Sequence, residues 1–275
     1  MAAPTTQAAP SDDANRAAIT QRTLRRDRWW VQPTVSGAVL LAFIVYSTYA
    51  AFQNADYFYK PYISPFYSPC LVDTCNVARA GSQHVSVPHL GIFGTWWSIS
   101  PAILILIFPL GFRMTCYYYR KAYYRAFLMS PPGCAVAEPR KTYTGETRFP
   151  LILQNIHRYF FYFGLIFNVI LTYDAVVSFR NHNDQWGHVG VGTAVLCVNA
   201  ILLWAYTLSC HSCRHIIGGR LKHFSKHPIR FKLWGVVTKL NTRHMQLAWC
   251  SLIFVGLTDL YIRLVSSGTI HGGWV

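Results

Sequence analysis

The stretch Val189-Gly-Val-Gly-Thr-Ala-Val-Leu-Cys-Val-Asn-Ala-Ile-Leu-Leu-Trp-Ala-Tyr-Thr-Leu-Ser209 leads directly into Cys210-His-Ser-Cys-Arg-His215. The apolar part is close to the ~20 residues that an α-helix needs to cross the hydrocarbon core of a bilayer. Thiols and imidazoles are the side chains that bind transition metals most readily. The sequence therefore predicts metal-type ligands at the point where a membrane helix meets water, an arrangement typical of a membrane redox protein.

The composition of the whole chain agrees with a membrane location. Of its 275 residues, 52% are hydrophobic and 13% are charged, whereas soluble domains are about 25% charged. Five apolar windows have a length suited to spanning, at about 35–52, 98–118, 159–178, 189–209 and 246–265. We predict an all-α integral membrane protein, a bundle of five transmembrane helices.

The positions of lysine and arginine predict how this bundle is oriented. They are concentrated before the first window, between the second and third windows, and from Cys210 to Arg243. Because positive charge in short loops stays on the cytoplasmic side, the N-terminus is expected inside and the C-terminus outside, in the plasma membrane. The net charge of +15 then describes one basic face that suits anionic lipid or an acidic partner, and no nucleic-acid partner is expected.

The first 21 residues differ from the rest of the chain. They are rich in Ala, Thr, Pro, Gln and Ser and contain no apolar core of a signal peptide. We expect residues 1–21 to be a disordered cytoplasmic tail and residues 22–275 to form the five-helix anchor domain. No loop is long enough for a soluble domain, so any catalytic domain is expected on another chain.

Cys70 and Cys75 lie in the first outer loop, in Ser68-Pro-Cys-Leu-Val-Asp-Thr-Cys75. On the oxidising side of a membrane, such a pair favours a small disulfide over a metal pair. We predict a Cys70–Cys75 disulfide.

Cysteines and histidines also gather at the opposite, inner end of the predicted helices. Cys210 and Cys213, with His157 and His244 from neighbouring helix ends, make up the two-thiolate, two-imidazole set of a Rieske-type [2Fe-2S] centre. Imidazole ligands raise the reduction potential relative to an all-thiolate cluster, which suits electron transfer to a quinone. The alternative ligands are Cys116 for a thiol, and His211 and His215 for the imidazoles.

Two other interpretations stay open. His157 and His244 could be the axial ligands of one haem b, although this would leave Cys210 and Cys213 without a role. The chain could also be a metal-free membrane scaffold, since buried cysteine often behaves as a small hydrophobic residue. Asp174 and Asp259 lie within apolar windows, where a structural ion pair or hydrogen bond is favoured over a proton path.

Several longer strings carry a resemblance to a known family. They are Cys116-Tyr-Tyr-Tyr-Arg-Lys-Ala-Tyr-Tyr-Arg125, Ser130-Pro-Pro-Gly-Cys134, Tyr143-Thr-Gly-Glu-Thr-Arg-Phe-Pro150, Gln154-Asn-Ile-His-Arg-Tyr-Phe-Phe161, the Ser209 to His215 box and Asn241-Thr-Arg-His244. Together they resemble the single-chain membrane anchor of actinobacterial succinate dehydrogenases, over about residues 25 to 265. The better-known single-chain anchors use four helix-borne histidines for two haems, a pattern that this sequence lacks.

The resemblance implies a five-helix anchor of complex II, not catalytic alone, that docks a flavoprotein subunit and an iron-sulfur subunit and passes electrons to quinone. Inner-end residues suited to a quinone headgroup, or else to an interfacial aromatic belt, are Trp29, Trp30, Tyr117, Arg120, Tyr124, Tyr159 and Trp249. Basic residues that would receive an acidic face of the iron-sulfur subunit, or only set the topology, are Arg25, Arg26, Arg28, Arg120, Lys121, Arg125, Arg140 and Lys141.

Overall fold

A computed structural model of the chain describes residues 27–72, 75, 91–97, 99–136, 138–139, 147–149, 151–181 and 183–270. The predicted tail, residues 1–21, lies outside the described residues, as do Arg25, Arg26, Arg140 and Lys141. The described part is almost entirely helical.

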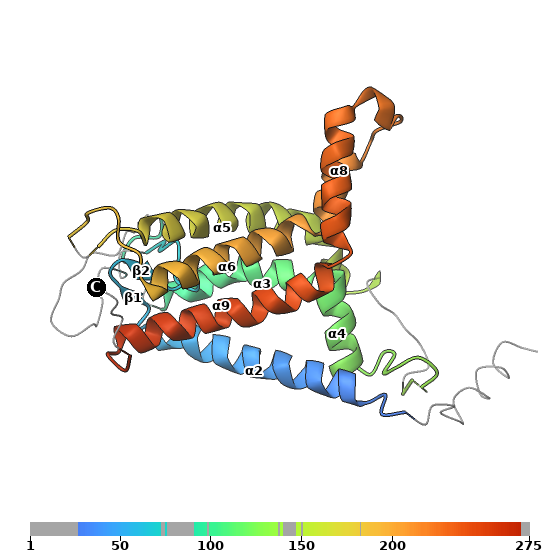
Figure 1. Ribbon diagram of the computed structural model, residues 1–275. Coiled ribbons are helices and arrows are strands. Elements are labelled where there is room, and N and C mark those ends of the chain that lie inside the picture. The colour runs from blue at the N-terminus through green and yellow to red at the C-terminus, as the bar shows by residue number, and fades with distance from the viewer. Residues whose placement is uncertain are drawn as a thin grey trace, which may run out of the picture.

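Four long helices run side by side along one direction (Figure 1): α2 (Val31–Gln53), α5 (His157–Val177), α6 (Val191–Leu208) and α9 (His244–Ser266). Each is long and apolar enough to cross a membrane, α5 together with the preceding short helix η3 (Leu151–Ile156). They correspond to four of the five predicted windows, with ends that differ by a few residues. The outward residues of these helices are apolar, as expected for side chains in contact with lipid.

The predicted helix at 98–118 ends early: α3 (Pro101–Met114) fills most of that window, and the chain then bends into α4 (Tyr117–Phe127), of which only the first two residues lie inside it. Helix α3 packs against α5. The next helix, α4, is bent by 83° from the direction of α3. The break lies at Thr115 and Cys116, where Cys116 adopts an extended backbone conformation. The chain therefore has four candidate spans among the described residues, or five if α3 and α4 are counted as one bent span.

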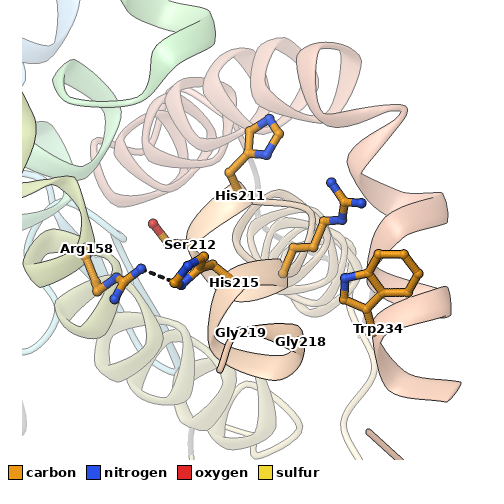
Figure 2. Close-up of a pocket in the computed structure, with 8 residues that line it drawn as sticks. Arg158, His211, Ser212, His215, Gly218, Gly219 and Trp234 are labelled. Carbon is orange, nitrogen blue, oxygen red and sulfur yellow. Dashed lines mark hydrogen bonds between the residues drawn. The ribbon is translucent and has the colours of Figure 1, made fainter. Parts of the chain in front are cut away.

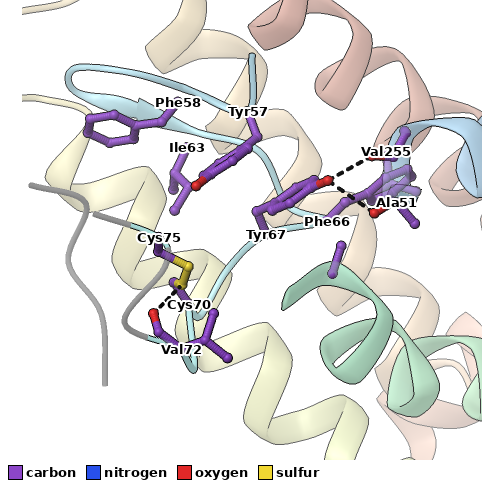
Figure 3. Close-up of a cluster of buried hydrophobic side chains, with 12 residues drawn as sticks. Ala51, Tyr57, Phe58, Ile63, Phe66, Tyr67, Cys70, Val72, Cys75 and Val255 are labelled. Atoms are coloured by element: carbon purple, nitrogen blue, oxygen red, sulfur yellow. Dashed lines mark hydrogen bonds between the residues drawn. A yellow bond between two sulfur atoms is a disulfide. The ribbon is translucent and has the colours of Figure 1, made fainter. Parts of the chain in front are cut away.

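One end of the bundle, which we call the disulfide end, is closed by a compact loop (Figure 3). Two short strands, β1 (Phe58–Tyr59) and β2 (Tyr62–Ile63), pair antiparallel, with Phe58 opposite Ile63. Cys70 and Cys75 are joined in a disulfide, with their Cα atoms 6.3 Å apart. The loop is filled by buried aromatic rings, among them Tyr57 stacked on Tyr67 with ring centroids 4.1 Å apart. The loop thus has its own small core, which packs against the ends of α2 and α3.

A buried ion pair fastens α9 to the disulfide end. Arg263 Nε lies 2.7 Å from Asp259 Oδ2, one turn apart on α9. Tyr46 of α2 donates a hydrogen bond of 2.6 Å to the same carboxylate, and Ser64 donates to its other oxygen. Arg263 also donates to the carbonyl of Ala50 at the end of α2, over 2.9 Å. The ion pair expected for Asp259 is therefore present, and it joins α2, α9 and the loop.

The other end of the bundle, which we call the histidine–cysteine end, carries a helical hairpin. Helix α7 (His211–Gly218) follows α6, and α8 (Pro228–Asn241) packs against α7 after the short turn η4 (Phe224–Lys226). In Figure 1, α8 runs across the direction of the long helices and extends beyond the side of the bundle. If the long helices cross a membrane, α8 lies along its surface.

Candidate functional site

Four side chains from different helix ends meet at the histidine–cysteine end. Nε2 of His157, at the start of α5, lies 3.1 Å from Sγ of Cys210, which precedes α7. Nε2 of His244, at the start of α9, lies 3.4 Å from Sγ of Cys116, at the corner between α3 and α4. Two thiol–imidazole pairs are thus held in one buried layer.

Neighbouring hydroxyl groups fix the tautomer of both imidazoles. Nδ1 of His157 lies 2.7 Å from the hydroxyl of Thr115, and Nδ1 of His244 lies 2.6 Å from that of Ser209. Each hydroxyl already donates its single proton to a backbone carbonyl, that of Gly111 or Tyr206. The hydroxyls must therefore accept from Nδ1–H, which leaves the lone pair on Nε2, directed at the sulfur. This is the protonation state in which an imidazole nitrogen can bind a metal.

Three other residues named as ligands from the sequence are not part of these two pairs: Cys213, an expected ligand, and His211 and His215, two of the alternatives. Cys213 is buried in the same cluster, but within the described part of the chain its sulfur makes no hydrogen-bonding contact with either imidazole. His211 stacks on Tyr118, with centroids 6.5 Å apart, and His215 bonds to Arg158. The structure thus pairs His157 with Cys210 and, separately, His244 with Cys116, a thiol named only as the alternative to Cys213.

Burial keeps these thiols protonated. Removal from water raises the pKa of Cys210 to about 12 and also raises the pKa of Cys213. A metal ion would have to displace these protons, because the thiolate is the binding form. Among the described residues, no three His, Cys, Asp or Glu side chains lie close enough together to hold a metal ion as they stand. The ligands come instead as two separate pairs.

Aromatic rings fill the space between the two imidazoles. Phe112 stacks on His157 with ring centroids 5.1 Å apart, and Tyr206 stacks on His244 at 5.2 Å. Phe112 and Tyr206 contact each other at 5.3 Å. The rings form a continuous row from one imidazole to the other.

The two middle rings of this row, Phe112 and Tyr206, border an apolar cavity of about 280 Å³ inside the bundle. Side chains from α2, α3, α5, α6 and α9 line it, including Phe112 and Tyr206. Two other lining residues, Phe52 and Leu110, are 65% and 54% exposed on the outside of the bundle. The cavity therefore extends from the lipid-facing surface to the residues that pack on the imidazoles.

Two polar groups in the cavity wall were not among the residues expected from the sequence. The Tyr206 hydroxyl is buried and makes no hydrogen bond within the described part of the chain. The Arg113 guanidinium lies 4.9 Å from the Tyr206 ring and donates to the hydroxyls of Tyr119, at 2.5 Å, and Ser251, at 3.2 Å. A lone arginine within an apolar window was visible in the sequence, and such a residue is by default a sign of function.

Comparisons with known proteins agree with this geometry. Residues 31–268 match the model of the family described as actinobacterial succinate dehydrogenase subunit SdhC. The chain belongs to this family. A chain of the solved Mycobacterium smegmatis Sdh1 complex in the apo form is 52% identical, and the match covers 92% of this chain and 94% of that one with a TM-score of 0.80. No curated protein matches the chain.

The resemblance predicted from the sequence is thereby confirmed. The chain is a membrane subunit of an actinobacterial succinate dehydrogenase complex, an oxidoreductase that it forms with other subunits. Its several apolar helices agree with a location in the membrane.

The quinone candidates of this succinate dehydrogenase subunit come from several elements. Tyr117, Arg120 and Tyr124 of α4 line one surface pocket together. Trp29 and Trp30 lie just before α2, Tyr159 is 67% exposed on α5, and Trp249 is in edge contact with Tyr119 of α4. Exposure on the outside of the bundle suits an interfacial belt for Trp30 and Tyr159.

Proposed function

We propose that this chain carries electrons from a docked iron-sulfur subunit, through a [2Fe-2S] centre of Rieske type, to a membrane quinone. The supporting observation is the pair of imidazoles whose unprotonated Nε2 atoms each face a buried thiol. Two thiols and two imidazoles are the donor set of that kind of centre.

The residues that would hold the cluster are Cys116, Cys210, His157 and His244. Their chemistry fits, because both imidazoles are neutral and held through Nδ1 and both sulfurs are buried away from competing ligands. Each thiol lies within hydrogen-bonding distance of its imidazole, so the pairs must separate to admit a cluster. When bound, a histidine-ligated cluster supplies one-electron transfer at a higher potential than an all-thiolate cluster.

The haem alternative fits less well. A haem held by both His157 and His244 would bind at Nε2 of each ring, and these two atoms face the thiols of Cys210 and Cys116. The two nearest thiols would also have no function.

The apolar cavity is suited to the quinone headgroup. Its volume is close to the lower end of small-ligand sites, roughly 300 Å³. The Tyr206 hydroxyl, which has no hydrogen-bond partner by distance among the described residues, would donate to a quinone oxygen, and Arg113 places a positive charge beside the Tyr206 ring. Because Phe112 and Tyr206 also contact the imidazoles, a headgroup here would lie one ring away from the proposed ligands. We favour this cavity over the pocket on α4 for the headgroup.

The partner subunits would dock at the histidine–cysteine end. This end carries Arg120, Lys121 and Arg125 on α4 and the basic hairpin α7–α8. Complementary charge would orient an acidic face of the iron-sulfur subunit, with the flavoprotein beyond it. By the distribution of positive charge, this is the cytoplasmic face of the plasma membrane.

The test is spectroscopic. The complex containing this chain is purified, partly reduced and examined by low-temperature electron paramagnetic resonance and by reduced-minus-oxidised visible spectroscopy. We expect a rhombic signal of low average g that disappears in His157→Ala/His244→Ala. The matched control, His223→Ala/His227→Ala, removes two histidines of the hairpin outside the site and should keep the signal.

Two other results would contradict the proposal. A haem α-band without the rhombic signal would assign His157 and His244 to axial ligation. Neither signal, in a complex that still contains this chain and its partners, would make the chain a metal-free anchor.

A further inference from the structure

Besides the apolar cavity, the protein has a polar pocket of about 450 Å³ between α5, α7 and α8 (Figure 2). Its polar walls are formed by Arg158, His211, Ser212, Arg214, His215 and Trp234. It is separate from the apolar cavity and shares no lining residue with it. Two arginines, two histidines and a hydroxyl converge there, and its walls contain no carboxylate.

Arg158 and His215 form one side of this pocket. The guanidinium of Arg158 donates to Nδ1 of His215 over 2.6 Å. Because arginine stays protonated, His215 accepts at Nδ1 and carries its proton on Nε2. The imidazole is therefore a donor on its other side. This half of the pocket offers N–H groups and positive charge.

Arg214 forms the other side. Its Nε donates to the hydroxyl of Thr238 over 3.1 Å, and its guanidinium lies 4.9 Å from the Trp234 ring centroid. Held in this way, the guanidinium keeps its terminal N–H groups for a further acceptor.

Within the described part of the chain, no carboxylate lines this pocket to balance these charges. The sequence contains no Asp or Glu between Asp184 and Asp259, although lysine and arginine are frequent in that stretch. Two ion pairs seen among the described residues, those of Asp184 and Asp259, both lie far from this pocket along the chain. The pocket therefore has the chemistry of a site for an external anion, and arginine forks suit the oxygens of a phosphate.

The position of the pocket indicates where that phosphate comes from. Arg158 belongs to the first turn of α5, and α7 directly follows α6, so the pocket lies level with the start of α5 and the end of α6. Its outer wall, α8, runs across the spans (Figure 1) and exposes apolar side chains, Ile229 at 74% and Leu233 at 50%. Lys232 is exposed beside them. Such a helix lies in the headgroup layer, with its apolar residues toward the acyl chains.

We propose that the pocket between α5, α7 and α8 binds the phosphate group of an anionic phospholipid, and that α8 lies beside that lipid in the membrane interface. The lipid phosphate accepts from Arg158 and Arg214, and the acyl chains run along the bundle. This inference needs the membrane location of the chain but not the iron-sulfur centre.

The test uses the purified succinate dehydrogenase complex, depleted of lipid in detergent. Its melting temperature is measured with added phosphatidylglycerol, with phosphatidylcholine and with inorganic phosphate, and native mass spectrometry counts retained phospholipid. In the wild type, we expect phosphatidylglycerol to raise the melting temperature more than either other addition. Arg158→Gln/Arg214→Gln should lose this difference and the retained lipid, with binding about tenfold weaker for each arginine.

Two variants serve as controls. Lys222→Gln/Lys226→Gln removes the same charge from the hairpin outside the pocket and should keep the effect of phosphatidylglycerol. Arg158→Lys/Arg214→Lys keeps the charge and should retain part of the binding. The comparison of the three additions is made on the wild-type complex, so the proposal can be tested even if a variant folds poorly.

Three results would overturn the proposal. An equal shift with inorganic phosphate would assign the pocket to a free anion. An unchanged lipid effect in the glutamine variant would place the lipid elsewhere. Loss of a partner subunit from that variant, with no retained lipid in the wild type, would assign the pocket to a protein contact.

Discussion

Nε2 of His244 lies 3.4 Å from Sγ of Cys116, although the two residues are 128 positions apart in the sequence. This contact depends on the break in the predicted second helix. Because the chain turns by 83° between α3 and α4, Cys116 faces the start of α9 and is not carried onward along a continuous helix.

This contact makes Cys116 a better candidate ligand than Cys213. We expect Cys116→Ser to abolish the rhombic signal and to lower the iron content of the purified complex, because a hydroxyl replaces a soft thiolate ligand. Cys213→Ser changes a buried thiol of the same cluster and is the matched control, with iron content and signal retained. If the signal is lost in Cys213→Ser but kept in Cys116→Ser, the two thiolate ligands are Cys210 and Cys213.

Ser209 is expected to act by holding the imidazole of His244. Ser209→Ala removes the acceptor for Nδ1–H, so the ring loses its fixed tautomer and orientation. The complex should lose iron to a chelator more readily, with an affinity lower by roughly 10-fold to 100-fold. Ser225→Ala, on the exposed turn before α8, should behave as the wild type. Equal iron retention in both variants would show that the hydroxyl has only a packing role.

Tyr206→Phe tests whether the Tyr206 hydroxyl binds quinone or is only a buried group in the packing of the bundle. The substitution keeps the aromatic row and removes only a hydroxyl that has no partner in the described structure. If the hydroxyl binds quinone, kcat/KM for quinone should fall by about 10-fold, the equivalent of one hydrogen bond of roughly 1.4 kcal/mol. Succinate oxidation with a soluble artificial acceptor should stay unchanged. Unchanged quinone kinetics together with a raised melting temperature would indicate a merely buried hydroxyl.

The buried ion pair should matter for stability and not for electron transfer. Asp259→Asn leaves Arg263 charged and without its partner inside the bundle, which costs about 3–5 kcal/mol of unfolding free energy. We expect a clear fall in the melting temperature of the complex. Asp184→Asn breaks the exposed pair with Lys60 and is the control, with little change expected. Similar melting temperatures for the two variants would show that the Asp259–Arg263 ion pair does not stabilise the protein.

The thiol of Cys210 should react slowly once iron is removed. Burial raises its pKa to about 12, so very little thiolate is present near neutral pH, and thiolate is the form that is alkylated. In the iron-free complex, labelling of Cys210 should therefore be slower than labelling of the exposed Cys134 at every pH from about 7 to about 9. The check is mass spectrometry of peptides after timed alkylation. Rapid labelling of Cys210 near neutral pH would show that the site opens when iron leaves.

Much of the architecture could be read from the sequence. The four long helices follow from apolar runs of spanning length, since backbone groups in hydrocarbon must be paired within a helix. The Asp259–Arg263 pair could be anticipated because an isolated charge in that position would be costly. The family was identified from strings at the inner loops, which the comparisons confirmed.

Hydropathy could not show that the 98–118 window is broken. A window average does not distinguish one straight span from an apolar helix followed by a polar one at a steep angle. In this chain the second part, α4, is amphipathic and rich in tyrosine and arginine, and it leaves the direction of α3 at Cys116.

The sequence by itself determined which kinds of groups are present: spanning helices, a basic end, and thiols and imidazoles at that end. Only the tertiary structure decided which thiol faces which imidazole, which hydroxyl fixes each tautomer, and that Tyr206 and Arg113 share a cavity. The physical reason is that helix formation and burial in lipid depend on local composition, whereas contacts across 128 positions depend on the angle at which one helix ends and the next begins.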